Sequence, residues 1–166
     1  MDKWHASAIR EKVFNTDGNL YFLGAYQVGT DDIAIAFGVS RFSEARRISS
    51  VPILSHRYEI PLYLSVLYIH PVQKFTVPEF AELDYPSLAD IKIHTEEPNS
   101  IIRFELLSCE IGTIFTAYLD ERLEWRHVDM PILVGKVVES RFIIFFTEDV
   151  SVSVSDEEII RYLEVI

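Results

Sequence analysis

The stretch that decides the fold reads SIIRFELLSCEIGTIFTAYLDERLEWRHV, from Ser100 to Val128. Apolar and polar residues alternate along most of it, which is the pattern of a β-strand with one buried face. Gly112 ends a first strand, and the pair Asp120 and Glu121 predicts a second turn. The stretch therefore predicts three antiparallel strands joined by tight turns.

Strand-like stretches also lie on the N-terminal and C-terminal sides of this region. Asn19–Val28 and Ile33–Ser40 are rich in aromatic and β-branched residues and flank the turn sequence GTDD, so they predict a β-hairpin. Tyr58–Val72 predicts a long strand whose early part lies at an edge or a bulge, because Pro61 has no N–H to donate. Arg141–Phe146 is apolar on both faces, as expected of a central strand.

Helical patterns occur near the two ends of the sequence. Asp2–Val13 places Trp4 and Ala8 on one face at helical spacing. The stretch SDEEIIRYLEVI begins with Ser155 and Glu158 in the spacing of a capping box, and acidic residues fill its first turn. We therefore predict an α+β fold, mainly antiparallel β-sheet, with short N-terminal and C-terminal helices.

Chain length and charge distribution bear on the domain organisation. The 166 residues suffice for a substantial core, so we predict a single domain over residues 1–166. The net charge of −11 is uneven, because residues 1–83 carry 9 acids and 8 bases whereas residues 84–166 carry 17 acids and 7 bases. Gly29-Thr30 and Gly112-Thr113 align at half the chain length, which leaves open a weak two-half organisation, 1–83 and 84–166.

Composition excludes several classes of protein and partner. Cys109 is the single cysteine, so the chain is not a disulfide-rich secreted scaffold. The N-terminal residues lack an apolar signal-peptide core, and no apolar run reaches the ~18 residues of a membrane-spanning helix. The acidic balance disfavours nucleic acid and anionic membrane surfaces as partners and favours a basic protein or a cation. We therefore expect a cytoplasmic protein.

The sequence contains no recognisable catalytic or cofactor motif. Glycine-rich phosphate loops are absent, and we expect no cofactor. Asp31 and Asp32 are interpreted as turn residues, because neighbouring side chains on a strand point to opposite faces. A pocket in which His70 or His127 meets a carboxylate and Cys109 stays open as an alternative. Five histidines are not spaced as a helical metal pair, so we expect no metal: His5, His56, His70, His94 and His127.

A group of acidic and aromatic residues is the strongest candidate for a partner-binding surface. It falls within the predicted hairpins of the second half, where aromatic anchors lie among carboxylates that would accept lysine or arginine from a partner. The alternative is a solvated sheet face on which Arg103, Arg122 and Arg126 form cross-strand ion pairs. The predicted partner-binding residues are Glu105, Glu110, Tyr118, Asp120, Glu121, Glu124, Trp125 and Asp129.

In general character, an acidic, aromatic-rich, cytoplasmic α+β domain without a catalytic motif resembles the bacterial immunity proteins that neutralise basic nuclease toxins. The resemblance covers no motif. It implies a non-enzymatic protein-binding domain that inhibits a basic effector, such as a nuclease toxin, through its acidic second half. Two alternatives stay open: a small enzyme or small-ligand-binding domain with a pocket of aromatic residues and histidine, and a structural homo-oligomer that pairs through an exposed strand such as VSVSVS, residues 150–155.

Overall fold

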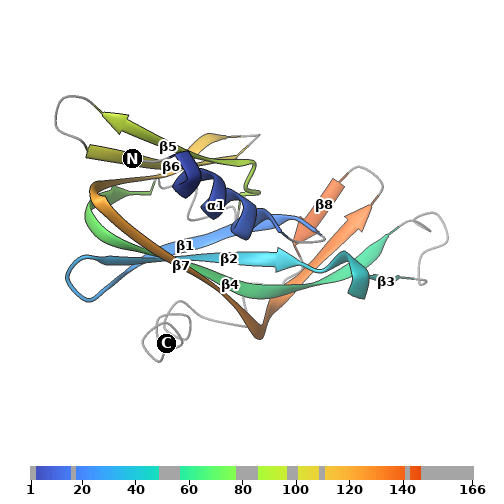
Figure 1. Ribbon diagram of the computed structural model, residues 1–166. Coiled ribbons are helices and arrows are strands. Elements are labelled where there is room, and N and C mark those ends of the chain that lie inside the picture. The colour runs from blue at the N-terminus through green and yellow to red at the C-terminus, as the bar shows by residue number, and fades with distance from the viewer. Residues whose placement is uncertain are drawn as a thin grey trace.

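The computed structural model describes residues 3–15, 18–48, 57–77, 86–96, 101–108, 111–140 and 143–146. Within these residues, one helix lies over one face of a curved antiparallel sheet (Figure 1). None of the described helices has the length and apolar character needed to cross a membrane. The elements are α1 (Lys3–Phe14), β1 (Leu20–Val28), β2 (Asp32–Ser40), a short 3₁₀ turn η1 (Phe42–Glu44), β3 (Arg46–Arg47), β4 (Tyr58–Thr76), β5 (Asp90–Glu96), β6 (Ile101–Ser108), β7 (Gly112–Ser140) and β8 (Ile143–Phe146).

The strands form one sheet in the order β1-β2-β4-β7-β6-β5, with β3 paired to β4 and β8 paired to β7. Its centre is the antiparallel pair of β4 and β7, which extends from Tyr58 opposite Glu139 to Thr76 opposite Thr116. On one side β1, β2 and β4 form a meander, and on the other side β5, β6 and β7 form a second one. The two meanders therefore meet along the two longest strands (Figure 1).

The two glycines that align in the sequence both occupy turns with a left-handed backbone. The φ angle is +73° at Gly29 and +86° at Gly112, a region that glycine enters without steric cost. Gly29 lies between the first and second strands of its meander, whereas Gly112 is the first residue of β7, the third strand of the other. The aligned residues therefore share a turn conformation but not an equivalent place in the two meanders.

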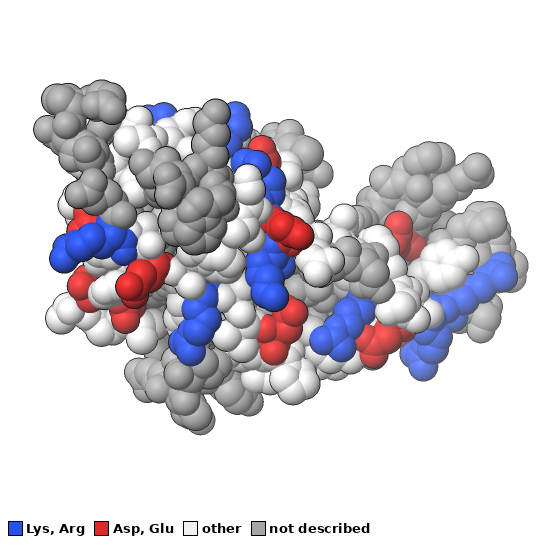
Figure 2. All heavy atoms as spheres, in the orientation of Figure 1, with Lys and Arg blue, Asp and Glu red and all other residues white. Residues whose placement is uncertain are grey.

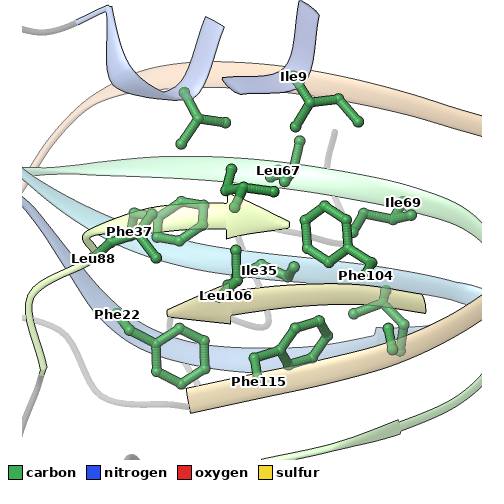
Figure 3. Packing of buried hydrophobic residues seen from close by; sticks show 14 of the residues in the cluster. Ile9, Phe22, Ile35, Phe37, Leu67, Ile69, Leu88, Phe104, Leu106 and Phe115 are labelled. Carbon is green, nitrogen blue, oxygen red and sulfur yellow. The ribbon is translucent and has the colours of Figure 1, made fainter. Parts of the chain in front are cut away.

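The first core cluster lies between α1 and the sheet. Ile9 and Val13 of α1 are fully buried there, and in Figure 3 Ile9 points from the helix towards the strands. Phe22, Phe104 and Phe115 belong to the same cluster, with the ring centroids of Phe104 and Phe115 6.2 Å apart. The Arg10 guanidinium fixes the helix to the edge strand β5, because it donates to Asp90 Oδ1 at 3.0 Å and to the Ile91 carbonyl at 2.7 Å.

A second cluster of buried residues is formed by side chains on the other face of the same strands. In β4, the buried side chains of Ile60, Leu62, Leu64 and Val66 belong to it, while Leu67 and Ile69 belong to the first cluster. The later part of β7 adds buried apolar residues to the second cluster, at Met130, Val134 and Val137. β2 is therefore buried on both faces along nearly its whole length, whereas β4 contributes to the second cluster in its first part and to the first cluster in its later part.

The main correction to the predicted fold concerns the turn at Asp120 and Glu121. These residues lie inside the continuous 29-residue strand β7, so the predicted hairpin is wrong. The ladder between β4 and β7 is irregular at this point: His70 lies opposite Glu124, and Val72 lies opposite Leu119. The extra β7 residues are therefore accommodated as a bulge where β4 contains proline 71, which has no N–H for the ladder.

Other predictions are confirmed or corrected locally. The antiparallel sheet and the N-terminal helix are confirmed, with bounds within a residue or two for α1, β1 and β2. The strand Asp90–Glu96 was not predicted. A strand within Arg141–Phe146 is confirmed as β8, which pairs with β7, and its central place in the sheet stays a prediction. The predicted C-terminal helix, which begins at Ser155, lies outside the described residues.

Candidate functional site

The site begins at the turn between β1 and β2. Gly29 allows a tight reversal after Val28, and the side-chain amide of Gln27 donates to the Thr30 carbonyl at 3.1 Å. The N–H of Val72 on β4 donates to the Asp31 carbonyl at 2.7 Å. This bond ties the turn to the neighbouring strand, so that Asp31 and Asp32 are held beside His70 of β4.

Both aspartates approach the same imidazole. Asp32 Oδ1 accepts a hydrogen bond from Nδ1 of His70, and Asp31 Oδ1 lies 3.7 Å from that nitrogen. The three side chains are about half exposed, and each offers an oxygen or nitrogen that lies within 4.8 Å of the other two. We call Asp31, Asp32 and His70 the His70 cluster.

This convergence changes the interpretation of the aspartate pair. The argument that adjacent side chains diverge applies to two residues of one strand. Asp31 belongs to the turn, however, and only Asp32 belongs to β2. Their side chains are therefore free to converge, and the pair is part of a polar cluster as well as a turn.

Strand β7 completes the surroundings of the His70 cluster. Glu124 lies opposite His70 in the ladder. Asp120 accepts hydrogen bonds from the backbone N–H of Arg122 at 2.7 Å and from its guanidinium at 2.7 Å. A hollow of about 220 Å³ opens at this point, lined by Asp31, His70, Pro71, Arg122 and Glu124.

The local charges favour positive groups at this site. The hydrogen bond to Asp32 raises the pKa of His70 most, the charges of Asp32, Asp31 and Glu124 raise it further, and partial desolvation opposes them. The side-chain and backbone hydrogen bonds from Arg122 lower the pKa of Asp120. The recorded partners of the His70 ring in the described residues are carboxylates, so the arrangement suits the binding of a cation more than the activation of a nucleophile.

Two of the predicted acidic residues, Glu105 and Asp120, are paired with basic residues of the protein itself. Glu105 lies 3.3 Å from Arg103 and 3.7 Å from His94, and Asp120 is paired with Arg122. Figure 2 shows Lys and Arg interspersed with Asp and Glu on the face in view. Part of the acidic excess also lies elsewhere in the sequence, because residues 147–166 contain six acids and one base.

The predicted aromatic anchors, Tyr118 and Trp125, also lie in different environments. Tyr118 lies beneath Lys74, whose Nζ is 4.6 Å from the ring centroid, whereas Trp125 packs against the first core cluster. Asp129 is exposed, and Glu124 lines the hollow beside His70. Two further predicted residues cannot be placed: Glu110 lies outside the described residues, and the side chain of Glu121 does so as well. Of the predicted group, Glu124 is therefore the member that belongs to the candidate site.

A second histidine lies in a different environment. His127 Nε2 is 2.6 Å from Ser65 Oγ and 3.9 Å from Asp129 Oδ1, and both Ser65 and the imidazole are buried. In a catalytic triad the serine and the carboxylate contact opposite ring nitrogens, whereas here both lie nearest to the same nitrogen. This group therefore lacks the geometry of a hydrolase triad, and Cys109 lies outside the described residues.

No protein-family model, curated protein or solved structure matches this chain. The interpretation of the site therefore depends on its own chemistry. Every residue of the His70 cluster can be identified in the sequence as a polar residue at a turn or a strand end. Their convergence depends on the pairing of β2 with β4, which brings residues 38 positions apart into contact.

Proposed function

We propose that this protein is a non-enzymatic, cytoplasmic binding domain that recognises a basic protein, as immunity proteins recognise basic toxins. The proposal keeps the partner class expected from the charge and moves the contact to the His70 cluster and Glu124. The supporting observation is the distribution of ion pairs. Glu105 and Asp120 are paired with arginines, whereas the ion pairs recorded for Asp31 and Asp32 within the described residues are with His70.

The hollow gives this acidic surface a shape. Asp31 lines it from the β1–β2 turn and Glu124 from β7, and Pro71 contributes an apolar wall. A lysine or arginine of a partner could place its alkyl stem against that wall and its charge between the carboxylates. Exposed acids of this kind raise the association rate of a basic partner and make it dependent on salt.

The test is capture from a lysate of the source organism, followed by kinetics with the purified captured protein. The double variant D31N/E124Q removes two charges at the hollow, and E11Q/E44Q removes two exposed charges elsewhere as a matched control. We expect D31N/E124Q to lower the association rate constant by about tenfold at low salt and E11Q/E44Q to change it by less than about twofold.

Two results would contradict the proposal. If capture at low salt yields no basic protein, the proposed class of partner is wrong. If D31N/E124Q and E11Q/E44Q have equal association rates, the assignment of the binding surface to the hollow is wrong, because the attraction would then depend on total charge alone.

One observation favours a second candidate function, a small-ligand-binding domain. His70 meets carboxylates beside a hollow of about 220 Å³, which is small for an organic ligand. The lining is charged rather than aromatic, so a ligand would be a small cation or amine. The third candidate, a homo-oligomer paired through VSVSVS, depends on residues outside the described part of the chain.

A further inference from the structure

We infer that the His70 cluster is a binding site for a divalent transition-metal ion. The inference concerns a ligand that the proposed function does not include. It does not depend on that function, because metal binding is measured on the isolated protein.

The donor set is the first argument for a metal site. One imidazole nitrogen and two carboxylates come together from the β1–β2 turn, β2 and β4, with their donor atoms within 4.8 Å of one another. An ion among them would lie about 2.0–2.2 Å from each ligand atom, so the three donor groups are close enough to share one ion after small movements of the side chains. Binding at Nδ1 would release to solvent the proton that His70 donates to Asp32. An imidazole among the donors distinguishes this group from a solvated patch of acids.

The backbone supports the donors from two directions. The hydrogen bond from the Val72 N–H to the Asp31 carbonyl fixes the turn. The β2–β4 ladder ends at Ile33 opposite Ile69, and these two residues directly adjoin Asp32 and His70 in the sequence. The ligands therefore do not depend on a single flexible loop. Half-exposed side chains also leave coordination positions open to water or to a group from a partner.

The surrounding charges favour an ion of charge +2. Glu124 lies opposite His70 and lines the same hollow, so three carboxylates surround the site. Arg122 of β7 also lines the hollow, and its guanidinium is hydrogen-bonded to Asp120 at 2.7 and 3.1 Å. The net charge around the imidazole is therefore negative even with this arginine at the rim.

The imidazole also determines which metals fit. Ca²⁺ and Mg²⁺ are bound mainly by oxygen ligands, whereas Zn²⁺ and Mn²⁺ accept imidazole together with carboxylate. We therefore expect Zn²⁺ to bind more tightly than Ca²⁺ at this site.

The first experiment is calorimetric titration of the purified chain with ZnCl₂ and, separately, with CaCl₂. The test variant is H70Q, and H94Q is its matched control, because His94 has similar exposure and lies beside a single carboxylate, Glu105. We expect one Zn²⁺ per chain, an affinity at least about tenfold lower in H70Q, and a change of less than about twofold in H94Q.

A second measurement avoids any variant. The five imidazoles can be followed by nitrogen-15 NMR of the wild-type chain while one equivalent of Zn²⁺ is added. Selective shifts of the His70 nitrogens would support the site. The inference is overturned if His70 does not respond, if H70Q binds Zn²⁺ as tightly as wild type, or if Ca²⁺ binds as tightly as Zn²⁺. These results do not affect the test of the basic partner, which uses association rates without added metal.

Discussion

At the scale of single residues, two histidines of the central strand pair have opposite environments. His70 on β4 is half exposed among carboxylates, which raise its pKa. His127 on β7 is buried beside Ser65, and burial lowers its pKa, with the charge of Asp129 acting in the opposite direction and that of Lys12 in the same direction. The carboxylates around His70 therefore favour its protonated form, whereas burial favours the neutral form of His127.

The pKa of His127 predicts a pH dependence of stability. Below its ordinary pKa of 6.5, the unfolded chain binds a proton at this residue that the folded chain does not bind. The contribution of His127 to the free energy of unfolding therefore falls as the pH drops through this value, and the fall ends below the folded pKa. Each unit of pKa difference is worth up to about 1.4 kcal/mol.

The measurement compares urea unfolding of wild type and H127Q between pH 7.5 and 5.5. Glutamine retains a group that can hydrogen-bond Ser65 but does not titrate, and the effect of His70 cancels because both proteins contain it. We expect the stability advantage of wild type over H127Q to shrink as the pH falls. A difference that stays constant across this range would contradict the assignment.

At the scale of elements, the described side chains of α1, from Ser7 to Phe14, show how the helix is attached to the sheet. Ile9 and Val13 supply its buried side chains, and Arg10 supplies its polar link to β5. Isolated helices of this length are marginal in water, so the helix depends on this packing.

We predict that Ile9→Ala lowers the free energy of unfolding by about 3 kcal/mol, because a fully buried side chain is lost and a cavity remains. The control on the same helix is Glu11→Ala, which changes an exposed residue and should stay within about 0.5 kcal/mol of wild type. Thermal and urea unfolding measure both values. A small effect of Ile9→Ala would mean that α1 contributes little to the stability of the sheet.

Within one strand, the sequence predicts which side chains face the core, because this depends on their alternation along the strand. It does not predict the features that depend on which strands pair and in which register. The alternation of Leu123 and Trp125 with Arg122 and Glu124 correctly predicts which residues face the first core. The strand Asp90–Glu96 shows the same alternation, which could have identified it. The bulge in β7 and the approach of Asp32 to His70 depend on the register with β4, and register is a long-range property that no local pattern specifies.

At the scale of the whole molecule, β7 connects the two core clusters. Phe115 and Leu119 in its first part belong to the first cluster, and Met130 and Val134 in its later part belong to the second. The strand pairs with β4 over nearly the full length of that strand. A change that disrupts the packing of either cluster therefore removes contacts from the same strand, β7.

This arrangement predicts a single cooperative unfolding transition. Tryptophan fluorescence, which includes Trp125 beside the first cluster, should give the same urea midpoint as far-ultraviolet circular dichroism. Leu62→Ala in the second cluster should move both curves together. Separate midpoints for the two signals, or a shift of one signal alone, would show that the clusters unfold independently.

The pairing of β4 with β7 also sets an order of events during synthesis on the ribosome. Because a chain is made from its N-terminus, β1, β2 and β4 emerge before the strand that pairs with the other edge of β4 exists. Ile60 must wait for Val137, its partner in the ladder, and until then this edge is open to other nascent chains. The half-made chain is therefore the stage at which this edge is most exposed to pairing with the wrong strand.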